Sequence, residues 1–296
     1  MSQNFDRRTA LKSLIAGTVA MGIPSSLSAM AVSDASNSSD FIPKGKINHS
    51  VARWCFGDME LEALCIAAKK MGITGIDLVG PKDWPILQKH QLVSTMCNGA
   101  ELNLVDGFND PKFHDQLIKN YTAMIPLVAQ AGYKNLICFS GNRRGKTDEE
   151  GWNNCVKGLQ TLIPLAEKHQ VTLVMELLNS KIDHKDYQCD RTYWGVELAK
   201  RINSPHFKLL YDIYHMQIDE GDVIRTIKEN HQYIAHFHTA GVPGRNEIDE
   251  TQELHYPAIM KAIAATGFTG FVGQEFMPKQ KDKMAALQQA IAICDI

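Results

Sequence analysis

From residue 47 to the C-terminus, short runs of apolar and β-branched residues alternate with longer segments of mixed polarity. This alternation is typical of βα units, which place their strands in one parallel sheet. The apolar runs predict eight strands: Ile47–Ala52, Gly75–Val79, Leu92–Cys97, Asn135–Ser140, Thr172–Glu176, Lys208–Asp212, Ile234–His238 and Phe271–Glu275. Apolar positions three and four residues apart predict seven helices: Leu61–Met71, Phe113–Ala131, Glu149–His169, Tyr193–Ile202, Asp222–Asn230, Tyr256–Thr266 and Lys281–Ile293.

Strands and helices in this order fit a closed (β/α)8 barrel, the TIM barrel, which forms a single catalytic domain over residues 46–296. The third unit is the least regular, because residues 99–110 are typical of a long loop. A doubly wound open sheet is the structural alternative. Its dinucleotide-binding form has no support, since no GxGxxG follows a predicted strand, and the phosphate loop GxxxxGKS or GxxxxGKT is also absent.

The first 31 residues have the pattern of a targeting segment. The adjacent Arg7 and Arg8 precede an uncharged stretch over residues 13–23, and Ala29 and Ala31 flank Met30 as in a small-x-small cleavage site. These features predict a twin-arginine signal peptide over residues 1–31 and hence export, with a periplasmic location. Residues 32–45 then form a flexible tether. Cleavage leaves a chain close to the roughly 250 residues of one barrel.

Composition narrows the classes of partner. The formal net charge of −2 gives no electrostatic reason to expect nucleic acid or an anionic membrane as a partner. Beyond the export signal, no stretch is long and apolar enough to span a bilayer. The seven cysteines are odd in number and include no CxxC pair, which argues against a zinc ribbon or a fully paired disulfide framework.

Four polar residues end successive predicted strands. Glu176, Asp212, His238 and Glu275 each terminate an apolar run, and they are spaced by roughly one βα unit. The carboxyl ends of barrel strands line one rim, so these side chains should converge there. Three carboxylates at close range repel one another unless a cation neutralises them. The pattern therefore predicts a site for one divalent ion, Mn²⁺ or Mg²⁺, with these four residues as ligands.

Further polar residues follow the same strands. His215 lies in the loop after Asp212 and is placed to bond a substrate hydroxyl, and His236 points to the same side of its strand as His238. Arg245 ends a Gly- and Pro-containing loop, and its planar guanidinium suits a substrate carboxylate. Three residues after early strands are candidates either for the pocket wall or for apolar closure of the barrel: Trp54, Trp84 and Asn98.

Four motifs carry a resemblance to a known family: Tyr211–Gln217, Glu220–Ile227, Ala240–Arg245 and Gly270–Pro278. They resemble the hydroxypyruvate isomerase family of the xylose isomerase-like barrel superfamily. The resemblance implies the same four metal ligands, acid–base roles for Glu176 and Glu275, and substrate contacts from His215 and Arg245. The chain departs from the family in its export signal, in the segment Ser50–Gly57 and in the loop of the third unit.

The expected activity is isomerisation of a small hydroxy-carbonyl acid, nominally hydroxypyruvate to tartronate semialdehyde, through an enediolate with the two glutamates as acid and base. A ketose 3-epimerase on the same scaffold is the nearest alternative, and an exported barrel that binds a sugar or sugar acid without turnover is another. An endonuclease would need a basic face that the charge does not provide. A homo-oligomer is left open.

Overall fold

The computed structural model describes residues 43–296. The predicted signal peptide, and the predicted tether up to residue 42, lie outside the described residues. No helix in the described part has the length and apolar character needed to cross a bilayer.

The described residues form eight parallel strands that close into a barrel in sequence order. Adjacent strands pair throughout, and the barrel closes where β1 pairs with β8 from Asn48 opposite Phe271 to Val51 opposite Gln274. The strands are β1 (Asn48–Ala52), β2 (Gly75–Val79), β3 (Val93–Cys97), β4 (Asn135–Cys138), β5 (Thr172–Glu176), β6 (Phe207–Asp212), β7 (Ile234–Thr239) and β8 (Phe271–Gln274). The predicted single-domain barrel is confirmed.

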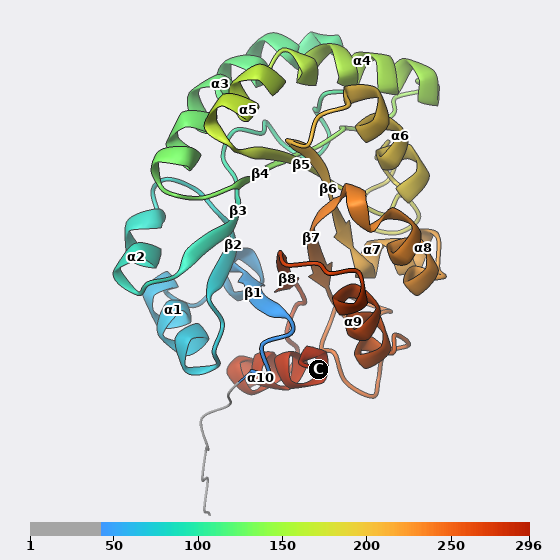
Figure 1. Ribbon diagram of the computed structural model, residues 1–296. Helices are drawn as coiled ribbons and strands as arrows, with labels where there is room; N and C mark the ends of the chain where they lie inside the picture. Colours follow the sequence, from blue (N-terminus) through green and yellow to red (C-terminus); the bar gives the residue numbers. More distant parts are fainter. Residues whose placement is uncertain (1–42) are drawn as a thin grey trace, which may run out of the picture. The chain divides into compact units, whose positions relative to one another are not determined.

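Helices surround the strands, as Figure 1 shows in a view along the barrel. They are α1 (Leu61–Lys70), α2 (Trp84–Lys89), α3 (His114–Gln130), α4 (Asp148–Gln160), α5 (Ile163–His169), α6 (Thr192–Ile202), α7 (Ile213–Asp219), α8 (Val223–Asn230), α9 (Tyr256–Ala265) and α10 (Lys283–Cys294). Three 3-10 turns add η1 (Arg53–Phe56), η2 (Pro111–Phe113) and η3 (His231–Tyr233).

The structure corrects the predicted helices in two respects. The single helix expected over Glu149–His169 is two helices, α4 and α5, because Pro164 in the first turn of α5 cannot continue the hydrogen bonds of α4. The short helices α2 and α7 were not predicted. Residues 99–110 are irregular, as expected, and Asn103 shapes a turn there by accepting from the backbone N–H groups of Val105 and Asp106.

The strands bury both faces, one toward the barrel interior and one under the helices, which explains their nearly continuous apolar character. Each of the seven cysteines lies in the described residues, is buried and has a free thiol. They therefore pack as small apolar side chains.

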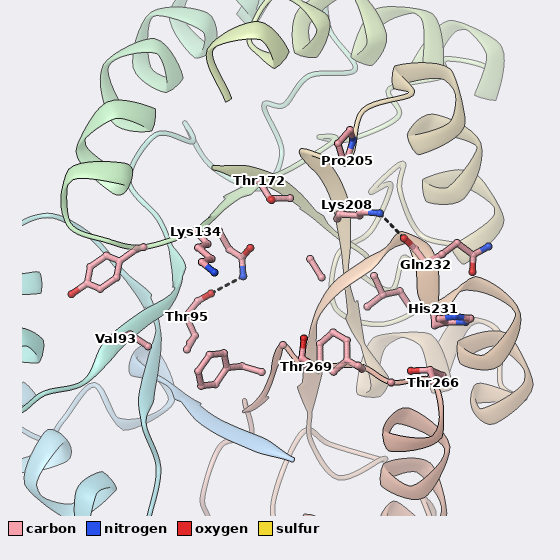
Figure 2. Close-up of a pocket in the computed structure, with 18 of the residues that line it drawn as sticks. Val93, Thr95, Lys134, Thr172, Pro205, Lys208, His231, Gln232, Thr266 and Thr269 are labelled. Atoms are coloured by element: carbon pink, nitrogen blue, oxygen red, sulfur yellow. Dashed lines mark hydrogen bonds between the residues drawn. The ribbon is translucent and has the colours of Figure 1, made fainter. Parts of the chain in front are cut away.

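A hollow of about 680 Å³ lies at the amino-terminal ends of the strands (Figure 2). Its lining includes Val93, Thr172 and Lys208, each at or next to the start of its strand, and the side chain of Lys208 reaches the carbonyl oxygen of Gln232. In TIM-barrel enzymes this face contributes to stability and the chemistry occurs at the opposite end. The candidate site is therefore sought at the carboxyl ends of the strands.

Candidate active site at the carboxyl ends of the strands

The four predicted ligands converge. Glu176 and Asp212 are the last residues of β5 and β6, His238 lies one residue before the end of β7, and Glu275 directly follows β8. All four side chains are buried, and one ligand atom from each lies within 4.8 Å of the others. Such spacing suits an ion with metal–oxygen bonds of roughly 2.0–2.2 Å, and three carboxylates with one imidazole suit a hard divalent cation. The residues therefore fit a metal ion.

His238 divides its two ring nitrogens between two sets of carboxylates. Its Nδ1 lies 3.0 Å from Glu275 Oε2 and 3.3 Å from Glu176 Oε1, on the side of the candidate metal site. Its Nε2 lies 3.2 Å from Oδ2 of Asp77, in the middle of β2. Sequence reasoning missed Asp77, although an acid inside an apolar parallel strand is itself a signal, because a buried carboxylate needs partners.

The charges in the site are strongly coupled. Burial raises the pKa of Asp212 to about 8 and also raises the pKa of Glu176, where the charge of Glu275 adds to the effect. Burial would raise the pKa of Glu275 too, but the positive charges of His238 and Arg245 outweigh it and hold this pKa well below its usual range. The carboxylates thus already depend on cationic partners, which is the condition under which a divalent ion binds.

Asp212 uses its two oxygens for different tasks. Its Oδ1 accepts from the backbone N–H groups of Tyr214, at 2.8 Å, and His215, at 3.2 Å, and so caps the N-terminus of α7. Its Oδ2 faces the site, 3.3 Å from Nη2 of Arg245 and 3.6 Å from Nε2 of His215. The cap fixes the carboxylate and starts the helix that carries His215, so this histidine lies on a helix and not in the expected loop.

The surroundings of His215 define its tautomer. Oδ1 of Asn179 accepts from the backbone N–H groups of Ile182 and Asp183, so its amide nitrogen must be the group 2.6 Å from Nδ1 of His215. An N–H donor at Nδ1 requires the proton of a neutral ring on Nε2. This Nε2 is buried with no hydrogen-bond partner among the described residues, and burial lowers the pKa of the ring well below its usual range. His215 therefore presents an unused N–H donor. Asn179 was missed by sequence reasoning.

Arg245 is held beside the ligands by carboxylates and by two aromatic rings. Its Nη2 lies 2.5 Å from Glu275 Oε2, and its guanidinium carbon lies 5.0 Å from the ring centre of Trp54 and 5.4 Å from that of Tyr214. Cation–π contacts of this kind orient a guanidinium. Its Nε has no partner among residues 43–296. The arginine therefore lies at the predicted rim with hydrogen-bonding capacity left for a ligand.

A cavity of about 490 Å³ opens above these groups. Its walls include Trp54, Asn98, His184, Glu176 and Glu275, together with residues of the loop after β3. The Nε1 of Trp54 donates to Glu275 Oε1 at 2.7 Å, which leaves Oε2 of the same carboxylate directed at His238 and Arg245.

Of the two roles that the sequence leaves open for Trp84, the structure shows the apolar one, because Trp84 does not line this cavity. Trp84 is buried in α2, where its Nε1 donates to the carbonyl of Val79 and its ring packs edge-on against Tyr133.

Comparison with known proteins places the chain in a family. The family described as "Xylose isomerase-like TIM barrel" matches residues 65–294. The hydroxypyruvate isomerase of Escherichia coli strain K12 is 26% identical over 235 residues, which cover 76% of this chain and 90% of that protein. The 2-oxo-tetronate isomerase of Cupriavidus necator is 35% identical over 109 residues, 37% of this chain, so the match spans only 41% of that relative's length.

Solved structures agree on the fold. The crystal structure of an AP endonuclease, family 2, from Brucella melitensis has a TM-score of 0.73 at 23% identity, covering 81% of this chain and 97% of its own. The IOLI protein, solved with a binding zinc atom, has a TM-score of 0.64 at 16% identity, covering 84% and 95%. The chain therefore belongs to the xylose isomerase-like TIM barrel family, as an enzyme that resembles the hydroxypyruvate isomerases.

Proposed function

We propose that the protein is a metal-dependent isomerase of a small hydroxy-carbonyl acid, nominally converting hydroxypyruvate to tartronate semialdehyde. The observation that carries the proposal is the buried group Glu176, Asp212, His238 and Glu275, with one arginine beside it in an open cavity. The curated relatives named for hydroxypyruvate and 2-oxo-tetronate isomerisation support an acid substrate.

The four converging residues would hold one Mn²⁺ or Mg²⁺ ion, with His238 contributing Nδ1. A bound ion would supply Lewis-acid polarisation of the substrate's carbonyl and neighbouring hydroxyl oxygens, which acidifies the adjacent C–H bond. The zinc atom bound by the IOLI protein supports a divalent ion on this scaffold.

The remaining chemistry belongs to the side chains. Glu176 and Glu275 come from β5 and from the end of β8, so they reach the cavity from different positions on the rim. An enediolate route removes a proton from one carbon and returns one to its neighbour, and each glutamate serves one of these steps. The Nε2–H of His215 donates to a substrate oxygen, and Arg245 pairs with the substrate carboxylate through guanidinium nitrogens that the ligands do not use.

A ketose 3-epimerase is the second candidate. It would use the same donors but move a proton at a single carbon. The observation in its favour is that Arg245 is already paired with Glu275 and Asp212, which reduces its capacity for a substrate carboxylate.

The deciding experiment combines metal content with proton exchange. Purified protein should contain about one divalent ion per chain, and with hydroxypyruvate in D₂O it should place deuterium in the product. Asp212→Ala should lose the ion and the exchange. The matched control is Glu229→Ala, an exposed acid on α8 away from the site.

Metal-free parental protein whose activity resists chelation would refute the metal-dependent mechanism. Metal binding without deuterium incorporation into any hydroxy acid or sugar would indicate a binding protein. Deuterium incorporation into ketoses but not into hydroxy-carbonyl acids would indicate the epimerase.

A further inference from the structure

A second polar cluster lies one layer below the candidate site, inside the barrel. Its centre is Asp77 on β2, a carboxylate with no solvent exposure in a strand that is otherwise apolar. A charge buried this deeply is costly unless it is fully hydrogen-bonded, so its partners indicate its role.

Every oxygen of Asp77 is bonded. Oδ1 accepts from the hydroxyl of Thr95. Oδ2 accepts from Ser50 Oγ at 3.1 Å, from His236 Nε2 at 2.9 Å and from His238 Nε2 at 3.2 Å. These donors come from β1, β3 and β7, so the barrel itself positions the carboxylate.

Gly273 on β8 makes room for this arrangement. A Cβ at that position would collide with Asp77 Oδ2 and would lie 2.9 Å from Cδ2 of His238. Any larger residue would have to displace the carboxylate from the imidazole, so the sequence of β8 accommodates the contact.

The bond to Asp77 restricts His238 in two ways. It keeps a proton on Nε2, and this leaves Nδ1 as the nitrogen that can bind a metal. It also fixes the ring plane, which is held from the other side by edge-on contact with His236 at 5.1 Å between ring centres.

We propose that Asp77 is a positioning residue that sets the tautomer and ring orientation of His238 so that Nδ1 completes the metal site. The inference rests on the proposed metal-dependent function and extends it to a residue on β2, a strand that is not adjacent to β7 in the barrel. A carboxylate that accepts from a metal-binding imidazole also makes the imidazole a stronger ligand. Metal affinity should therefore depend on Asp77, although Asp77 does not touch the metal.

The same atoms allow a competing interpretation. A candidate second metal group lies here, because one ligand atom from each of three residues lies within 4.8 Å of the others: Asp77, His236 and His238. Two observations favour hydrogen bonding. Asp77 is already saturated by Ser50 and Thr95, and an ion here would require His238 to bind metals through both nitrogens.

The test measures Mn²⁺ binding to the full protein by competition with a fluorescent chelator. The parent should bind one ion per chain, and Asp77→Asn should still bind one ion with an affinity about 10–100-fold weaker. Ser50→Ala is the matched control, because it removes one bond to the same carboxylate but keeps the charge, and it should change the affinity by less than about threefold. Circular dichroism confirms that each variant is folded.

A measurement on the parental protein is independent of any folding defect in Asp77→Asn. With ¹⁵N-labelled histidine and Zn²⁺ as a diamagnetic probe, the metal-shifted ring should carry its proton on Nε2. If His238 binds Zn²⁺ through Nε2, or if Asp77→Asn binds Mn²⁺ as tightly as the parent, the positioning role is overturned and the proposed function is not affected. If the parent binds two ions per chain and Asp77→Asn binds one, Asp77 belongs to a second metal site and is not a positioning residue. A parent that binds neither ion would refute the proposed function together with this inference.

Discussion

The two candidate acid–base residues occupy unequal environments. Glu176 is buried with a raised pKa, whereas His238, Arg245 and the indole N–H of Trp54 stabilise the ionised form of Glu275. Two carboxylates whose pKa values are separated by their surroundings are suited to opposite proton-transfer roles. Glu176 is therefore expected to be the base that takes the first proton from the substrate carbon.

Replacing either glutamate by glutamine tests this division. Glu176→Gln and Glu275→Gln keep an oxygen for the metal but lose the base, so each should retain metal while turnover falls by about 10²–10⁴-fold. Hydrogen exchange between substrate and D₂O shows which step each glutamate serves. A variant that exchanges the substrate proton without forming product has lost the glutamate that returns a proton to the second carbon. Glu229→Gln is the control. Near-parental isomerisation by both variants would contradict the two-glutamate mechanism.

Arg245→Lys tests recognition of the acid group. An ammonium keeps the charge but loses the planar fork and the guanidinium contacts with the rings of Trp54 and Tyr214, so KM for hydroxypyruvate should rise by roughly tenfold or more. Steady-state kinetics on an acid and on a neutral ketose give the comparison. An unchanged KM for the acid, with turnover of the ketose, would instead support the epimerase.

At the scale of elements, the strands were predictable and the short helices were not. Strands buried on both faces are apolar throughout, and this made β2 and β5 recognisable to the residue. The helices α2 and α7 have six and seven residues, too few for a 3.6-residue period to stand out. One long helix was predicted across Pro164 because the apolar pattern continues on both sides of it.

The same logic explains which site residues the sequence reveals. The four proposed ligands end strands, where polar residues interrupt an apolar run and the topology brings them together. Asp77 lies within its strand, and its partners are distant in sequence, on β1, β3 and β7. Asn179 acts through backbone groups of its own loop and a ring on α7. The acid within an apolar strand is visible in the sequence, but the partners that Asp77 and Asn179 bind are set by tertiary packing, which no local pattern encodes.

The contact between β1 and the end of α10 gives a prediction for stability. His49 is buried there, with its Nε2 3.8 Å from Oδ1 of Asp295. Burial lowers its pKa to about 4, and the charge of Asp295 only partly opposes this. Between the unfolded pKa near 6.5 and the folded value, the unfolded chain takes up a proton that the folded chain does not. The free energy of unfolding should therefore fall as the pH drops through this window.

His49→Gln should remove this dependence, which amounts to at most about 3 kcal/mol between pH 6.5 and 4. Urea unfolding of parent and variant at pH 7.5 and 4.5 measures the difference. The exposed His231, replaced by Gln, is the control. An equal acid-induced loss of stability in the parent and in His49→Gln would show that His49 is not responsible.

At the scale of the whole molecule, we propose that residues 1–31 direct export. The paired Arg7 and Arg8 and the Ala29–Ala31 site predict cleavage before Val32. N-terminal sequencing of protein from periplasmic and cytoplasmic fractions should find Val32 in the former. Replacing both arginines by lysine should retain the uncleaved chain in the cytoplasm. Periplasmic protein that begins at Met1, or export that is indifferent to the arginines, would contradict the proposal.

The pairing of β1 with β8 also sets the order in which the protein can mature as it is synthesised. Seven strands can emerge and pair in order, but β1 and β7 keep open edges until the residues near Phe271 have left the exit tunnel. Glu275 follows directly after β8, so the ligand set is also completed at this moment. Barrel closure and assembly of the candidate metal site are thus a single late event in biosynthesis, and a nascent chain stalled before β8 has neither.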